Sequence, residues 1–170
     1  MPKIIENVKD RLLLEARQQI EQSGYGAVTI RSIAKGCGVG VGTVYNYFPS
    51  KEALIATHLL EDWISCIRTI EAMSSNSETA EPVLRCIHDQ LLCFAHRHSA
   101  IFRDEAAAAT FAGSFSQYHD RLRAQLAAPL RKFCGGDFDS LFLAEGLLTW
   151  TMAGKPFDEI FAILKKLFKE

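Results

Sequence analysis

Apolar residues recur at intervals of three and four along most of the chain, which is the spacing of one face of an α-helix. The first such segment covers residues 4 to 22 and stops at a glycine-containing turn, Ser23 to Gly26. Its apolar positions share one side of the predicted helix and are Ile5, Val8, Leu12, Ala16 and Ile20. The pattern therefore predicts an amphipathic helix with a defined end.

Two short helices are expected after this turn. Thr29 is suited to cap the first of them, and Gly36 and Gly38 are suited to end it. The second is expected over residues 41 to 47, because Pro49 interrupts the helical pattern. Two short helices joined by a tight glycine turn favour a helix-turn-helix, in which the first helix braces the second against the major groove of DNA.

The remainder of the chain also has helical spacing. A long helix is predicted to begin at Ser50, with Lys51 and Glu52 in its first turn, and residues 74 to 81 are predicted to form a loop. The helical segments are residues 50 to 73, 84 to 98, 100 to 112, 115 to 133, 138 to 153 and 156 to 168. The sequence has neither an alternating strand pattern nor an internal repeat.

These elements define an all-α fold of about nine helices. Residues 1 to 51 are expected to form a three-helix helix-turn-helix domain that binds DNA. Residues 52 to 170 are expected to form a helical bundle for ligand binding and dimerisation.

The last two predicted helices carry more apolar residues than the core of one subunit needs. A subunit interface is therefore expected over residues 138 to 168. The candidate interface residues are Phe142, Leu147, Phe157, Ile160, Phe161, Leu164, Leu167 and Phe168.

Composition and charge are those of an ordinary globular protein, with 48% hydrophobic and 23% charged residues. The net charge of −1 is unevenly distributed. Residues 1 to 51 carry seven Lys and Arg against four Asp and Glu, whereas residues 52 to 170 carry twelve against sixteen. A basic N-terminal segment on an acidic body suits a protein that contacts phosphate with one end only.

The five cysteines form no C-x-x-C pair, and no secretory leader is recognised, so a reduced cytoplasmic protein is expected. The apolar run from Gly146 to Gly154 is far shorter than the ~20 residues of a membrane span, so no membrane partner is expected. Cys86 and Cys93 share a helical face, with Cys66 as a possible neighbour, which leaves a thiol sensor or soft-metal site open. Buried, inert thiols are the favoured interpretation.

Enzyme and cofactor motifs are absent from the sequence. The glycines at 36, 38, 40 and 42 fit neither G-x-G-x-x-G nor a phosphate-binding G-K-[ST]. The histidines form no H-E-x-x-H pair, and no catalytic triad or carboxylate pair has a recognisable context. We therefore expect no enzyme, no catalytic residue, no metal and no cofactor.

Polar and aromatic side chains cluster on the second short helix. Thr43, Tyr45, Asn46 and Tyr47 supply hydrogen-bond donors and ring faces, and packing alone does not explain their grouping. The absence of side chains at Gly40 and Gly42 lets the backbone N–H groups at the helix start approach phosphates or base edges. The helix is therefore predicted to be a DNA-reading element.

The segment Thr29 to Leu54 resembles the tetracycline-repressor-like (TetR-type) family of transcriptional regulators. Matching positions include Gly42-Thr43-x-Tyr45-x-Tyr47-Phe48 and Ser50-Lys51-Glu52, and the resemblance covers roughly residues 8 to 60. Two positions depart from the family pattern, because Gly40 and Val41 stand where members often have Ser followed by Lys or Arg.

The resemblance implies a homodimer that binds a palindromic operator in double-stranded DNA. Base readout would fall to Val41, Thr43 and Asn46, since a methyl group can meet thymine and an amide can pair with adenine. The full implied set of DNA-binding residues is Thr29, Arg31, Gly40, Val41, Gly42, Thr43, Tyr45, Asn46, Tyr47 and Lys51.

The function expected is repression that a small, apolar effector relieves. Candidates to line an effector pocket are Trp63, Ile67, Phe94, Phe102, Phe111, Phe115, Tyr118, Leu122 and Trp150. Three alternatives stay open: a regulator that needs no ligand, a small-molecule-binding helical protein with a vestigial DNA-binding motif, and an activator.

Overall fold

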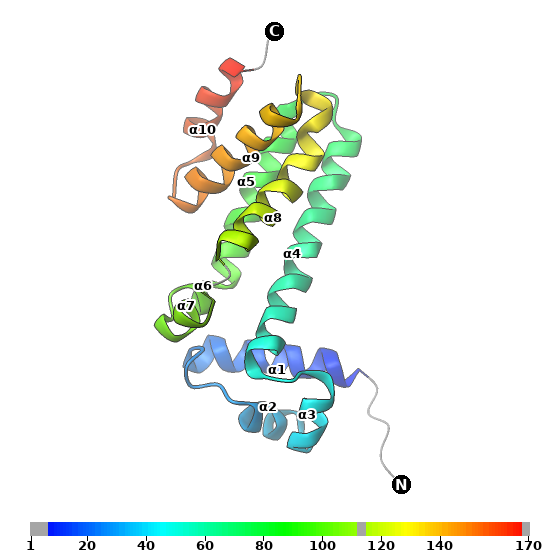
Figure 1. Cartoon of the computed structure of the whole chain (residues 1–170), viewed down its shortest axis with the longest axis vertical. Helices are drawn as coiled ribbons and strands as arrows, with labels where there is room; N and C mark the ends of the chain where they lie inside the picture. Colours follow the sequence, from blue (N-terminus) through cyan, green and yellow to red (C-terminus); the bar gives the residue numbers. More distant parts are fainter. Residues whose placement is uncertain (1–6, 112–114, 168–170) are drawn as a thin grey trace. The chain divides into compact units, whose positions relative to one another are not determined.

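The computed structural model describes residues 7–111 and 115–167, without the side chains of residues 111, 115–118 and 167 (Figure 1). These residues form ten α-helices and no strand, which confirms the all-α prediction of about nine helices. None of the described helices is long and apolar enough to cross a membrane. The elements are α1 (Val8–Ser23), α2 (Ile30–Cys37), α3 (Val41–Tyr47), α4 (Lys51–Asn76), α5 (Ala80–Arg97), α6 (Ser99–Phe102), α7 (Glu105–Phe111), α8 (Phe115–Ala127), the 3₁₀ segment η2 (Ala128–Phe133), α9 (Asp137–Met152), α10 (Phe157–Leu164) and the 3₁₀ segment η3 (Lys165–Leu167).

The chain divides into two compact units. Unit 1 comprises Met1–Glu61 and His98–Ala112, and unit 2 comprises Asp62–Arg97 and Gly113–Glu170. Unit 1 therefore contains more than residues 1 to 51, because the first part of α4 and the later helices α6 and α7 pack with the helix-turn-helix.

The core of unit 1 is built on the apolar stripe of α1. Leu12 and Ala16 are fully buried there, and they share one cluster with Ile33 of α2 and Val44 of α3. Ile101 of α6 joins the same cluster from a distant part of the sequence. Burial of one side of α3 leaves its remaining positions facing outward.

The start of α2 follows the predicted signal at Thr29, whereas its end falls at Gly38 and not at Gly36, which lies inside the helix. The Thr29 hydroxyl accepts a hydrogen bond from the Ser32 N–H at 3.0 Å, and the Ser32 hydroxyl accepts one from the Thr29 N–H at 3.0 Å. Gly38 follows α2 with φ 64°, in the left-handed region that a glycine adopts without strain. These caps fix the turn between α2 and α3.

The core of unit 2 joins α5, α8, α9 and α10. Leu84, Leu126 and Leu130 are fully buried in it. Several residues predicted to lie at a subunit interface also belong to this core. Those buried within the single chain are Leu147, Phe157, Ile160 and Leu164.

Three predicted boundaries are wrong. The segment 74 to 81 is only partly a loop, because α4 continues to Asn76 with Ser74 buried and donating to the Pro129 carbonyl at 2.7 Å. The helix expected over 100 to 112 is broken at Asp104, which separates α6 from α7. The helix expected to reach residue 133 changes to a 3₁₀ segment at Ala128, since Pro129 cannot donate a helical hydrogen bond. Ile5 and Phe168 lie outside the described residues.

The burial pattern of α1 makes a stability prediction. Leu12 is 0% exposed and Leu14 is 55% exposed on the same helix. We expect Leu12→Ala to lower the free energy of unfolding by about 2–5 kcal/mol through lost burial and a cavity. The matched Leu14→Ala should change it by less than about 0.5 kcal/mol. Denaturant titration of the full chain measures both values, and equal losses would contradict the assigned face of α1.

Candidate nucleic-acid interface

The outward face of α3 is exposed to solvent, although it carries two aromatic residues. Val44 is fully buried, whereas Tyr45 and Tyr47 are 53% and 48% exposed. Val41 and Asn46 are exposed as well, and Thr43 is half-buried. Neither tyrosine is used as a core residue, so both rings are available to a partner.

Two glycines, Gly40 and Gly42, leave the start of α3 without side chains at these positions. Gly40 is the N-cap and supplies no side-chain hydrogen bond. A Cβ placed on Gly42 would meet nothing within 4 Å. Internal packing therefore does not demand glycine at position 42, and the space beside the first turn stays open to a ligand.

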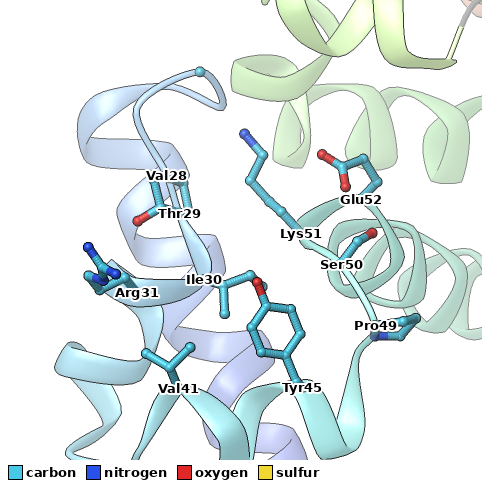
Figure 2. Close-up of a pocket in the computed structure, with 11 residues that line it drawn as sticks. Val28, Thr29, Ile30, Arg31, Val41, Tyr45, Pro49, Ser50, Lys51 and Glu52 are labelled. Carbon is cyan, nitrogen blue, oxygen red and sulfur yellow. The ribbon is translucent and has the colours of Figure 1, made fainter.

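An open hollow of about 590 Å³ lies between the starts of α2 and α4 and the side of α3. Figure 2 shows Thr29 and Arg31 on one side of it and Lys51 with Glu52 on the other. Five of the predicted DNA-binding residues line this hollow together: Thr29, Arg31, Val41, Tyr45 and Lys51. The others, Gly40, Gly42, Thr43, Asn46 and Tyr47, belong to α3 or its cap without lining the hollow.

Lys51 is held on the loop between α1 and α2. Its Nζ donates a hydrogen bond to the Tyr25 carbonyl at 3.1 Å and lies 4.0 Å from the centre of the Tyr25 ring. An ammonium group over a ring face is attracted by the electron-rich π system. The position of this cation therefore depends on the position of the loop.

Glu52 places a negative charge beside these cations. Its own backbone N–H and the Ser50 hydroxyl donate to the Glu52 carboxylate and lower its pKa, so the group remains ionised at neutral pH. The Ser50 hydroxyl also accepts from the Ala53 N–H at 3.1 Å, which confirms the predicted cap of α4. A carboxylate in the first turn is favourable for the helix.

Two residues that contact the loop beside the hollow were not predicted from the sequence. Tyr25 lies in the predicted turn from Ser23 to Gly26 and is buried in the structure. An aromatic residue between two glycines is a sequence signal that could have indicated this role. Asp104 gave no signal, because it meets the Gly26 N–H from 78 residues away.

The predicted pocket residues divide into two groups. Trp63, Ile67, Phe94 and Leu122 meet in the core of unit 2, where the Trp63 Nε1–H donates to the Gln125 side chain at 2.7 Å. Trp150 belongs to unit 2 but is 52% exposed, so it is not buried in that core. Phe102 belongs to unit 1 and is 53% exposed. The side chains of Phe111, Phe115 and Tyr118 lie outside the described residues.

Two of the three cysteines considered for a thiol sensor or soft-metal site are buried. Cys66 and Cys86 are buried, and burial raises the pKa of each thiol. Cys93 is exposed on the same helix as Cys86. A raised pKa disfavours the nucleophilic thiolate, as expected of packing residues.

Known proteins share both the N-terminal sequence and the fold. A family model for bacterial regulatory proteins of the tetR family matches residues 12–57. The transcriptional regulator UidR of Escherichia coli is 37% identical over 54 residues, which are 32% of this chain and 28% of UidR. The transcriptional repressor KstR2 of Mycobacterium tuberculosis is 27% identical over 125 residues, 71% of this chain and 62% of KstR2. The matched region thus spans under a third of UidR and under two thirds of KstR2.

Solved structures match nearly the whole chain at low identity. A TetR transcriptional regulator from Legionella pneumophila has a TM-score of 0.61 and 21% identity, covering 98% of this chain and 100% of that one. The regulator FadR of Bacillus subtilis, solved with stearoyl-CoA, has a TM-score of 0.57 and 20% identity over 94% of this chain and 97% of FadR. Likeness at this identity concerns the fold alone. Residues 12–57 thus match the tetR family of bacterial regulatory proteins, and the chain shares the all-helical fold of solved regulators, one of them of TetR type.

Proposed function

We propose that this chain is a transcriptional regulator that binds double-stranded operator DNA through α3. The observation that carries the proposal is the exposed outer face of α3. Tyr45 and Tyr47 are exposed there, beside the hollow that Arg31 and Lys51 line. A helix of this kind fits the major groove, which is about 12 Å wide.

The contacts divide by chemistry. Arg31 and Lys51 supply the positive charge, and Thr29, Tyr45 and Tyr47 supply hydroxyl groups for phosphate oxygens. Val41, Thr43 and Asn46 face base edges, and the glycines at 40 and 42 let the backbone of α3 come close. Phosphate contacts set the register of the protein on DNA, and the base contacts set its sequence preference.

We propose that the protein acts as a homodimer on a palindromic site, with its two α3 helices about 34–36 Å apart. Unit 2 supports this with exposed apolar residues on α9 and α10. Phe138, Phe142 and Met152 are 75%, 52% and 48% exposed and share one face of α9, and Ile163 of α10 is 61% exposed. Because Leu147, Phe157, Ile160 and Leu164 are already covered, Phe142 becomes the centre of the proposed interface, with Phe161 at its margin.

We further propose repression that a small apolar effector relieves. KstR2 is a transcriptional repressor, and FadR of Bacillus subtilis was solved with stearoyl-CoA, in which the stearoyl chain is apolar although the CoA part is large and charged. In unit 2 of this chain, the Trp63, Phe94 and Leu122 cluster offers apolar surroundings with one internal polar pair, Trp63 and Gln125. Such an effector must bind the DNA-free state more tightly than the DNA-bound state.

The first test is selection of bound duplexes from a random pool, followed by titration at several salt concentrations. We expect a palindrome and a steep salt dependence, because neutralised phosphates release counterions. Lys51→Ala should weaken binding and lower the salt slope by about one, and Tyr47→Ala should weaken binding as well. Lys165→Ala removes an exposed cation of unit 2 and should bind like wild type. Failure to enrich any sequence would refute operator binding and direct work to ligand screening of unit 2.

Asn46 allows a test of base readout. Asn46→Ala should cost about 1–3 kcal/mol on the selected operator and relax the preference at one base pair of each half-site. Its affinity for unrelated DNA should stay near that of wild type, since the phosphate contacts remain. Repeating the selection with the variant measures both effects, and an unchanged preferred sequence would assign readout to other residues.

The proposed interface predicts a change in oligomeric state. Phe142→Asp should convert a dimer to monomers in sedimentation velocity, because a charge cannot be buried without a partner. Leu14→Asp, at a comparably exposed apolar site of unit 1, should leave the dimer intact. Leu164→Asp would test folding instead, since Leu164 is buried in unit 2. A stable Phe142→Asp dimer would contradict the interface.

A further inference from the structure

The Asp104 carboxylate connects two parts of unit 1 that are distant in sequence. Its Oδ1 accepts hydrogen bonds from the Ala106 and Ala107 N–H groups at 2.9 and 3.1 Å, which caps α7. Its Oδ2 accepts from the Gly26 N–H at 3.1 Å, in the loop between α1 and α2. One side chain therefore holds both the start of α7 and this loop.

The same loop also contacts Lys51. Tyr25 precedes Gly26, and its carbonyl and ring contact the Lys51 ammonium at 3.1 and 4.0 Å. Gly26 itself lines the hollow together with Lys51. A shift of the loop would thus move the surroundings of the cation that faces the hollow.

This double role requires two acceptor oxygens on one short side chain. A carboxylate supplies two oxygens, each able to accept hydrogen bonds, whereas an amide supplies one oxygen and an NH₂ donor. With asparagine at 104, the NH₂ group would oppose either the Gly26 N–H or the N–H groups of α7. The N–H donors of Ala107 and then Gly26 lower the pKa of Asp104, with a further contribution from the Lys51 charge, so the side chain is the carboxylate at neutral pH.

We propose that Asp104 is a positioning residue for DNA binding, which fixes the loop from α1 to α2 and, through it, the Lys51 ammonium at the edge of the hollow. This inference rests on the proposed function of α3 and its hollow. Asp104 touches no DNA in this proposal and acts only through the loop.

Charge alone would give the opposite effect. A carboxylate near a DNA-binding surface repels phosphates, so its removal should strengthen binding if electrostatics were its whole contribution. If Asp104 positions the loop, its removal should weaken binding instead. The sign of the change therefore separates the two explanations.

The experiment compares Asp104→Asn with Glu105→Gln in fluorescence-anisotropy titrations of the selected duplex. Glu105 is the exposed neighbour at the start of α7, so Glu105→Gln removes the same charge one residue away. We expect Asp104→Asn to bind about five- to tenfold more weakly, the size of effect that follows the net loss of one intramolecular hydrogen bond. Glu105→Gln should bind as tightly as wild type or slightly more tightly.

A second variant guards against a change in folding. Asp104→Ser keeps a good capping residue for α7, but its short side chain cannot also reach Gly26. It should weaken DNA binding as Asp104→Asn does, with a cooperative thermal unfolding transition like that of Glu105→Gln. If both Asp104 variants bind as tightly as Glu105→Gln, the inference is overturned while the proposed function stands. If wild type binds no duplex, the proposed function fails and this inference fails with it.

A double-mutant cycle tests the route through Lys51. In a Lys51→Ala background, Asp104→Asn should lower the affinity by a clearly smaller factor than in wild type, because the cation that it positions is gone. A general loss of structure would lower the affinity by the same factor in both backgrounds. Equal factors would therefore overturn the assignment.

Discussion

The proposed DNA-binding surface depends on the burial of two side chains, Val44 and Phe48. A seven-residue helix such as α3 is unstable alone in water, because the cost of forming the first turn is spread over few hydrogen bonds. Val44 is fully buried and Phe48 is 3% exposed in the cluster built on α1. These anchors hold α3 in place and leave the other side chains of the helix free of any role in the core. Tyr45 and Tyr47 are exposed because Val44 and Phe48 alone anchor this segment in the core.

Polar contacts fix the ends of the elements that surround α3, in addition to their apolar packing in the core of unit 1. The reciprocal bonds of Thr29 and Ser32 hold the start of α2, and Ser50 holds the start of α4. Asp104 and Lys51 each form a hydrogen bond with the loop between α1 and α2. These contacts hold the starts of α2 and α4 and the loop between α1 and α2 in place without any partner molecule. Pre-organisation of this kind lowers the entropy cost of binding.

In unit 2, the apolar residues of α9 and α10 are divided between the core and the exposed surface. Of the side chains on α9 and α10, Leu147 and Leu164 are buried within the chain, whereas Phe138 and Ile163 remain in solvent. Helical periodicity alone placed all of this segment in a candidate interface. In the structure, α5 and α8 cover one side of α9, and this contact divides its apolar residues between the core and the outer face.

Local sequence patterns predicted the helical fold, the turn between α2 and α3, the caps at Thr29 and Ser50, and the resemblance of the N-terminal segment to the tetR family. These features depend on residues that lie within a few positions of each other, so local spacing and backbone preference are sufficient to specify them. Tertiary structure decided the break at Asp104, the end of α4 at Asn76, the anchoring of Lys51 on Tyr25 and which apolar residues of α9 and α10 are exposed. Each of these rests on a contact between residues far apart in the chain, and no local pattern records which distant segment will supply the partner.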